Sequence, residues 1–159
     1  MQKLDTFLWF DGQAEQAVAF YLSVFPKAKA GRVLRWGDVG PPGKKGSVLT
    51  ADFEIDGQRF TALNGGPEYK FTPAVSFMIP CETQQEVDTY WDKLLADGGK
   101  PMACGWLTDK FGVSWQVTPV GLQEMLTDKD QARANRVMEA MMKMIKLDLP
   151  TLQKAYDAS

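Results

Sequence analysis

Asp52 and Glu54 are the pair of side chains whose chemistry and spacing first suggest a reaction. They lie two residues apart in a stretch of alternating polar and apolar residues, so both carboxylates project from one face of a predicted strand, with Cβ atoms about 6–7 Å apart. Carboxylates at such a separation act as acid and base in glycosidases. Two solvated strand residues give the same pattern, and we favour this second interpretation because the intervening apolar residues already supply a buried face.

The glycines do not form a phosphate-binding or dinucleotide-binding loop. Among the 14 glycines, no two are separated by a single residue, whereas the dinucleotide fingerprint begins with Gly-x-Gly. Gly37 and Gly43 have five residues between them where a phosphate loop has four, and two of these five are prolines without amide donors. We therefore predict a hairpin loop at 37–46 and no bound cofactor, S-adenosylmethionine included.

Histidine is absent, and the chain has only two cysteines, Cys81 and Cys104. An imidazole base and a Ser-His or Cys-His nucleophile pair are therefore excluded. Two thiols are too few for a thiolate zinc site or for the disulfide framework of a secreted protein. We predict that Cys104 packs as a small apolar residue, since no base or cation is near it in the sequence.

The charge balance argues against nucleic acid as a partner. The chain has 18 basic and 20 acidic residues, a net charge of -2, and no basic cluster beyond Lys44 and Lys45. This is too little positive charge to neutralise several phosphates. No signal peptide or long apolar run precedes Leu4. We therefore expect a cytoplasmic protein with no membrane segment.

A strand followed by an amphipathic helix occurs near the start of the chain. The apolar pattern predicts a strand at 4–10 and a helix that ends at Pro26. Strands are predicted next at 30–36, 47–55 and 58–63. The last two are joined by Asp56-Gly57, a strong hairpin signal because the two-residue turn needs positive φ. The first part of the chain therefore reads β-α-β-β-β.

The same pattern recurs from residue 75. A strand at 75–79 precedes Thr83 and Glu86, which form a capping box in front of a second amphipathic helix. A second hairpin is predicted from 102–107 and 113–118, and a fourth strand is not evident. Beyond residue 121 the spacing becomes helical, with a methionine-rich stripe and a last helix near Pro150. This stripe either packs on the sheet or on a second subunit, which we favour, or is a docking surface for varied partners.

Five short motifs resemble those of the PhnB-like branch, also described as 3-demethylubiquinone-9 3-methyltransferase-like, of the vicinal oxygen chelate (glyoxalase/bleomycin resistance/dioxygenase) superfamily. They lie at 7–12, 53–58, 62–67, 104–106 and 111–117. The resemblance implies an α+β fold in which two repeated βαβββ-like modules form a cupped mixed sheet, followed by C-terminal helices. We predict one domain over 1–159, with modules at about 1–66 and 74–120, a connector at 67–73 and a helical extension at 121–159.

Metal-dependent members of this superfamily hold their ion with histidines and glutamates from the first and last strands of each module. The resemblance places Leu4 and Ala74 at the histidine positions, Gln116 at a glutamate position, and the fourth position near 61–64. Aliphatic and neutral amide side chains do not make a divalent metal site. We therefore predict no metal and a ligand-binding cup formed by six residues: Leu8, Asn64, Phe71, Ser76, Ser114 and Gln116.

Two functions fit these features. The first is a metal-independent small-molecule-binding protein of the glyoxalase/bleomycin-resistance fold, which we favour because histidine is absent. The second is an enzyme of the same superfamily, a lyase, isomerase or dioxygenase relative, that uses Gln116, Asn64 and a carboxylate instead of histidine ligands. The Asn64-Gly65-Gly66 segment also fits a plain turn. Because the superfamily builds its cups by pairing modules, we further expect a homodimer in which helices within 130–146 contribute to the interface.

Overall fold

The computed structural model describes residues 4–158 of the protein. The chain divides between Phe71 and Thr72 into two compact units, and each is described by itself. This division falls inside the predicted connector. In the described part of the chain, no helix is both long and apolar enough to cross a bilayer.

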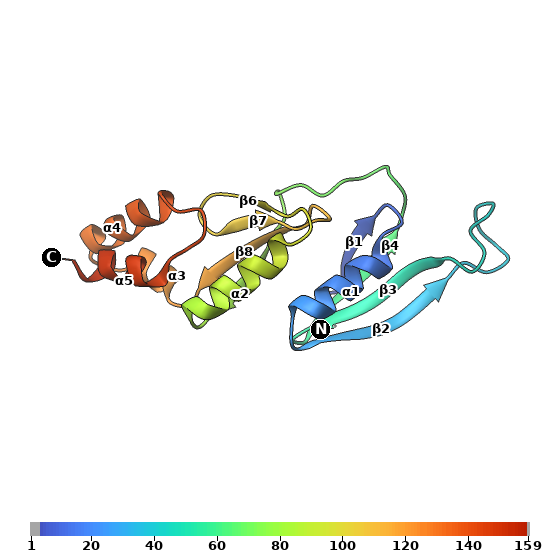
Figure 1. Cartoon of the computed structure of the whole chain (residues 1–159), viewed down its shortest axis with the longest axis horizontal. Coiled ribbons are helices and arrows are strands. Elements are labelled where there is room, and N and C mark those ends of the chain that lie inside the picture. Colours follow the sequence, from blue (N-terminus) through green and yellow to red (C-terminus); the bar gives the residue numbers. More distant parts are fainter. Residues whose placement is uncertain (1–3, 159) are drawn as a thin grey trace. The chain divides into compact units, whose positions relative to one another are not determined.

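The first unit is a four-stranded mixed sheet with one helix on it (Figure 1). The strand order is β1-β4-β3-β2, where β1 is parallel to β4 and the other neighbours are antiparallel. The predicted β-α-β-β-β order is confirmed. Its elements are β1 (Thr6–Phe10), α1 (Ala14–Val24), β2 (Ala28–Arg35), β3 (Val48–Ile55) and β4 (Gln58–Asn64).

The hairpin between β3 and β4 forms where Asp56 and Gly57 predict it. Both residues have positive φ, 45° and 86°, as a tight two-residue turn requires. The turn sets the register of the hairpin: Ile55 lies opposite Gln58, and three positions further along Asp52 lies opposite Thr61.

Alternate residues of the first sheet pack against α1 and leave the other face uncovered. The ring of Tyr21 on α1 stacks on Phe53 at 5.5 Å between centroids, and Phe53 stacks on Phe60 at 5.0 Å. This parity is the usual one for a sheet with one solvated face. The buried strand residues of this core are Leu8, Phe10, Ala51, Phe53, Phe60 and Ala62.

The second unit repeats the arrangement in a smaller form, with strand order β5-β8-β7-β6. Contrary to the sequence prediction, a fourth strand is present. It is β6, only two residues long and ending in proline, which is too short to show an alternating pattern. The elements are β5 (Phe77–Cys81), α2 (Gln84–Leu95), β6 (Lys100–Pro101), β7 (Trp106–Thr108) and β8 (Ser114–Pro119).

Two polar side chains define the ends of elements in this unit. The Thr83 hydroxyl accepts a hydrogen bond from the Glu86 amide at 3.2 Å, so the predicted helix cap is confirmed. Buried Asp109 organises the β7–β8 turn. Its carboxylate accepts from the amides of Phe111 and Val113 and from Trp115 Nε1, at 2.9, 3.1 and 2.9 Å.

The predicted strand at 102–107 starts later than expected, at Trp106. Cys104 and Gly105 have positive φ, 59° and 80°, and turn the chain toward the C-terminal helices. Their amides donate to the carbonyls of Met144 and Ile145, at 2.9 and 2.7 Å. A Cβ on Gly105 would lie 2.8 Å from the Leu147 side chain, so only glycine fits this close approach.

The helical extension belongs to the second unit and comprises α3 (Leu122–Leu126), α4 (Gln131–Met142) and α5 (Leu149–Asp157). It attaches to α2 through the Gln84 amide, which donates to the Leu147 carbonyl and accepts from the Leu149 amide. Lys146 adds an ion pair with Asp88, and its hydrogen bond lowers the pKa of that carboxyl. The extension has its own buried cluster of Leu122, Val137, Leu147 and Leu152.

Some side chains of the methionine-rich stripe are packed and others are exposed. Met141 and Met144 pack against the buried cluster of the extension itself, whereas the favoured interpretation expects them to pack on the sheet or on a second subunit. Met138 and Met142, one turn apart on the outer side of α4, are 40% and 67% exposed. α4 therefore has an apolar outer side in addition to its buried one.

Candidate functional site

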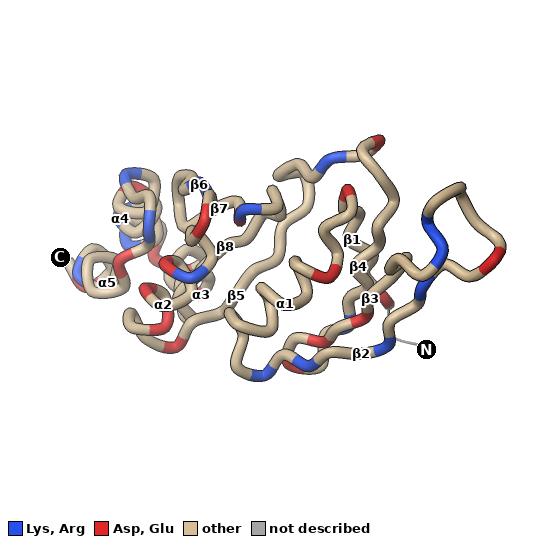
Figure 2. The backbone as a smooth tube through the Cα atoms, turned by 45° about the vertical axis from the view of Figure 1, so that its right-hand side comes forward, with Lys and Arg blue, Asp and Glu red and all other residues tan. Residues whose placement is uncertain are grey.

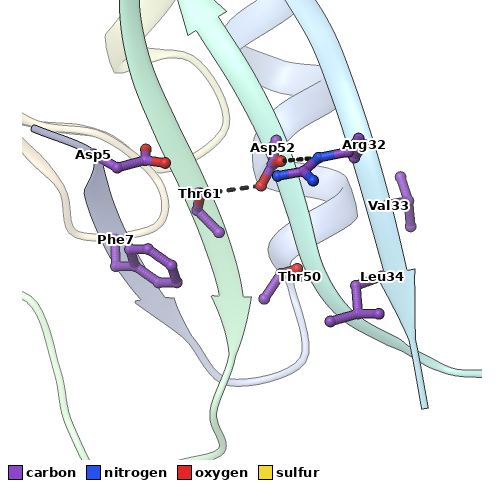
Figure 3. Close-up of a pocket in the computed structure, with 8 residues that line it drawn as sticks. All are labelled: Asp5, Phe7, Arg32, Val33, Leu34, Thr50, Asp52 and Thr61. Carbon is purple, nitrogen blue, oxygen red and sulfur yellow. Dashed lines mark hydrogen bonds and ion pairs between the residues drawn. The ribbon is translucent and has the colours of Figure 1, made fainter. Parts of the chain in front are cut away.

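The open face of the first sheet contains a hollow of about 480 Å³. All four strands of the first unit contribute side chains to it, and Asp5, the residue before β1, adds one more, as Figure 3 shows. Such a volume lies within the usual range of small-molecule sites. The hollow is lined by Asp5, Phe7, Arg32, Val33, Leu34, Thr50, Asp52 and Thr61.

A single row of side chains crosses the sheet at the middle of the hollow. Phe7 on β1 lies opposite Thr61 on β4, and Thr61 lies opposite Asp52 on β3. The Thr61 hydroxyl donates to Asp52 Oδ1 at 3.0 Å, and Arg32 Nε on β2 donates to Asp52 Oδ2 at 3.3 Å. One carboxylate thus connects three strands.

Gly31 allows β2 to reach this carboxylate. The pairing of β2 with β3 shifts register between Ala30 and Val33, so Gly31 and Arg32 lie in an irregularity of the strand. A Cβ on Gly31 would be 2.9 Å from Asp52 Cβ and 3.1 Å from the Asp52 carbonyl oxygen. An irregularity of this kind re-aims side chains, and here it places the Arg32 guanidinium beside Asp52.

Opposite charges lie on neighbouring strands of this face. On this face β2 carries Lys29 and Arg32, whereas β3 carries Asp52 and Glu54. Figure 2 shows basic positions along β2 and acidic positions along β3. Besides the Arg32–Asp52 pair, Arg59 Nη2 donates to Asp5 Oδ2 at 3.1 Å. The two carboxylates that line the hollow are therefore each balanced by a guanidinium, and the face has no large excess of either sign.

The three predicted site residues of the first unit lie outside this hollow. Leu8 is 5% exposed and points into the core, on the opposite side of β1 from Phe7. Asn64 accepts from the Ala14 amide at 2.9 Å and donates to the Val48 carbonyl at 3.1 Å, so it links α1 to β3. Phe71 packs edge-on against Phe10. These placements support structural roles for all three.

The three predicted site residues of the second unit lie together on β8 and beside β5. Gln116 Nε2 donates to Ser76 Oγ at 2.9 Å. Ser114, two residues before Gln116 on β8, is buried, and its hydroxyl has no hydrogen-bond partner among the described residues. The structure thus brings these residues into one uncharged polar row.

The cysteines have no visible part in this chemistry. Burial raises the pKa of the Cys81 thiol to about 11, with a smaller contribution from the charge of Glu86, so the thiolate is disfavoured. Cys104 Sγ lies 3.6 Å from the Met141 carbonyl, against the extension.

The residues present do not fit a divalent metal. Leu4 and Ala74, at the positions implied for histidine ligands, have no donor atoms, and Gln116 offers only a neutral amide oxygen. Within residues 4–158, no group of three or more histidine, cysteine, aspartate or glutamate side chains could hold a metal ion.

Most residues of the hollow were not predicted, although one signal pointed to them. The Asp56-Gly57 turn fixes Asp52 opposite Thr61, and that register alone indicates a polar pair on the open face. The parity of β1 was ambiguous because residues 7–10 are all apolar. Arg32 could not be placed from the sequence, because the shift at Gly31 changes which β2 residue reaches Asp52.

Comparison with known proteins gives relatives of the same fold. A PhnB protein of known structure from Bacillus cereus is 40% identical, covers 75% of this chain and 100% of its own, and superimposes with a TM-score of 0.66. A protein from Pseudomonas aeruginosa is 20% identical, covers 75% of this chain and 98% of its own, with a TM-score of 0.63. The fosfomycin resistance protein FosX from Listeria monocytogenes is 16% identical, covers 78% and 97%, with a TM-score of 0.55.

A search of curated proteins finds no match. A sequence model of the family described as 3-demethylubiquinone-9 3-methyltransferase matches residues 2–118, which include both sheets but not the helical extension. Together with the identity to the Bacillus cereus protein, this match shows that the chain belongs to that family, the PhnB-like branch of the vicinal oxygen chelate superfamily.

Proposed function

We propose that this protein binds a small molecule without a metal ion, and that the ligand occupies the hollow on the open face of the first sheet. The observation that carries the proposal is the hollow itself. It combines an apolar part, formed by Phe7, Val33 and Leu34, with a few polar groups fixed by hydrogen bonds. This combination of apolar area and few oriented polar groups is typical of small-molecule sites.

The exposure of the apolar side chains supports the same proposal. Phe7 is 60% exposed, Val33 52% and Leu34 55%. Covering such side chains contributes roughly 25 cal/mol per Å² of apolar area. A ligand with an apolar body therefore gains free energy at this face without any rearrangement of the sheet.

The enzyme alternative loses one of its expected groups. Both ends of the Asn64 amide are already hydrogen-bonded to backbone atoms of the same unit. Using Asn64 on a substrate would break the link between α1 and β3. Within residues 4–158 the side-chain carbonyl of Gln116 accepts no hydrogen bond, so we retain the row of Ser76, Gln116 and Ser114 as a second polar surface for a ligand.

A substitution that fills the hollow tests the proposed site. Thr50 lines the hollow between Phe7 and Leu34, as Figure 3 shows, and Thr50→Trp places an indole in the space that a ligand needs. Ligands found by screening a fragment library against the wild-type protein should bind this variant at least tenfold more weakly. Lys29→Trp, an exposed position on β2 outside the hollow, is the control. Equal binding of the fragments to the wild-type protein and to Thr50→Trp would move the site elsewhere.

Metal independence has its own test. A metal that saturates a real site at 100 times its dissociation constant would add about 2.7 kcal/mol of stability. We expect a thermal unfolding scan with zinc, iron, nickel and manganese to give shifts near zero. A reproducible rise of several degrees with one of these metals would contradict this part of the proposal.

We also propose that the protein forms a homodimer through the outer side of α4. Met138 and Met142 are exposed there, with Glu139 and Lys143 beside them. In a symmetric antiparallel pair of α4 helices, Met138 of one copy meets Met142 of the other, and Glu139 meets Lys143. The same patch is then self-complementary in both shape and charge, as a twofold interface requires.

A further inference from the structure

We propose that the ligand of the hollow carries an oxyanion, a carboxylate or phosphoryl group, that binds the guanidinium of Arg32. Its apolar body lies on Phe7, Val33 and Leu34. This inference rests on the proposed function, because it assigns a chemical class to the ligand of the same hollow. Some hydrogen-bonding groups of the hollow already have partners and others are free, and this difference is the basis of the inference.

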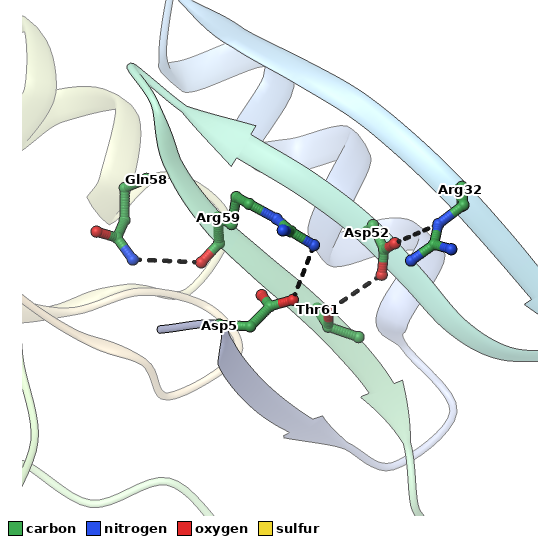
Figure 4. A network of polar contacts seen from close by, with 6 residues as sticks. All are labelled: Asp5, Arg32, Asp52, Gln58, Arg59 and Thr61. Carbon is green, nitrogen blue, oxygen red and sulfur yellow. Dashed lines mark hydrogen bonds and ion pairs between the residues drawn. The ribbon is translucent and has the colours of Figure 1, made fainter. Parts of the chain in front are cut away.

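Arg32 supplies most of the free donors. Its side chain is 89% exposed, and within the described residues its hydrogen bonding is limited to the contact of Nε with Asp52 (Figure 4). A guanidinium has five N–H donors in a planar fork. The Nη donors therefore remain available, and their geometry matches a carboxylate or phosphoryl group.

The carboxylates of the hollow are less available to a ligand. Asp52 accepts from Thr61 with one oxygen and from Arg32 with the other. Asp5 is paired with Arg59 (Figure 4). A cationic ligand would meet carboxylates that a guanidinium already neutralises, whereas an anion adds to the free Nη donors of Arg32 without breaking its bond to Asp52. The arrangement thus favours an anion over a cation.

Asp52 also prepares Arg32 for this role. It holds the guanidinium at Nε, so part of the ordering of a long side chain is achieved before a ligand arrives. The Thr50 hydroxyl, on the same strand as Asp52, lines the hollow and adds a neutral donor. Because Arg32 is largely exposed, its contact with an anion is screened by water, and we expect a moderate preference rather than an absolute one.

Four probes with the same eight-carbon chain separate the possible head groups: octanoate, octyl phosphate, octanamide and octylamine. Titration calorimetry on the full chain should show octanoate or octyl phosphate binding about tenfold more tightly than octanamide, and octylamine most weakly. The member of the anionic pair that binds more tightly identifies the carboxylate or the phosphoryl group as the preferred head group.

Arg32→Gln should remove the preference for the anionic probes while octanamide binding stays within about twofold. Arg35→Gln is the matched control, since Arg35 lies on the same strand, pairs with Glu15 and does not line the hollow. It should keep the preference. An unchanged anion preference in Arg32→Gln, tighter binding of octylamine, or no binding of any probe to the wild-type protein would overturn the inference.

The Thr50→Trp variant separates this inference from the proposed function. If it weakens all probes equally while Arg32→Gln changes none, the hollow is the site and the anionic class is wrong. If Thr50→Trp has no effect on octanoate, the hollow is not the site, and both proposals fail together.

Discussion

The two units share the order of their main elements but differ on their open sheet faces. The first has long strands, with eight residues each in β2 and β3, and its open face carries Arg32, Asp52 and the Asp5–Arg59 pair. In the second, β6 and β7 have two and three residues, and the polar row of Ser76, Gln116 and Ser114 is uncharged. Duplication of the fold has therefore not duplicated the chemistry, because the same core tolerates different residues on its solvated side.

Each unit is also stabilised by a different polar side chain, Asp109 in the second and Asn64 in the first. The largest expected effect tests this difference. Asp109→Ala leaves two amides and the Trp115 indole N–H without their acceptor, so we expect a loss of about 3 kcal/mol or more of unfolding free energy. Asn64→Ala in the first unit removes two neutral hydrogen bonds and should cost about 1–2 kcal/mol.

Urea denaturation measures both effects, and Asp38→Ala, at an exposed ion pair, serves as a control with a change below about 0.5 kcal/mol. Hydrogen exchange should show that each substitution loosens mainly its own unit. An equal loss of protection in both units after Asp109→Ala would mean that the units do not differ in this way.

The next prediction concerns the outer side of α4, whose exposed methionines form the proposed dimer contact. Met142→Asp should raise the dimer dissociation constant at least tenfold, or about 1.4 kcal/mol, because it places a charge in the proposed apolar contact. Glu139→Lys alone should weaken the dimer, and adding Lys143→Glu should restore it, since the swapped pair is again complementary. Sedimentation equilibrium measures all four proteins. A wild-type protein that is monomeric at micromolar concentration, or a double variant no better than Glu139→Lys, would contradict the helix pairing.

The smallest effect concerns acid sensitivity of the helical extension. The hydrogen bond from Tyr156 lowers the pKa of Asp128, with a smaller contribution from the Asp130 amide. A carboxyl whose pKa is lower in the folded state stabilises the fold at pH values above its unfolded-state pKa, which is near 4. This stabilisation is lost as the pH falls through the folded-state pKa. Between pH 6 and pH 3, Tyr156→Phe should therefore lose slightly less stability than the wild-type protein in thermal unfolding. A steeper loss in the variant would reverse this assignment.

Local sequence signals predicted the fold well because they depend on neighbouring residues. The Asp56-Gly57 turn and the Thr83 cap each follow from two or three adjacent positions, and both are confirmed. β6 was missed because two residues show no period. The candidate site was harder, since Arg32 and Asp52 are 20 residues apart and meet only through an irregularity at Gly31. Tertiary geometry of this kind leaves no periodic trace in the sequence.

The close approach of Gly105 to Leu147 has a consequence for how this chain can change. Gly105 lies in the hairpin, has no side chain, and its amide donates to the Ile145 carbonyl. The hairpin can therefore contact the helices that follow. Removing the helices would expose that amide and leave the Gln84 side chain without two of its partners, Leu147 and Leu149. A chain shortened after β8 would therefore lose these contacts and would need new residues at both positions before it regained its stability.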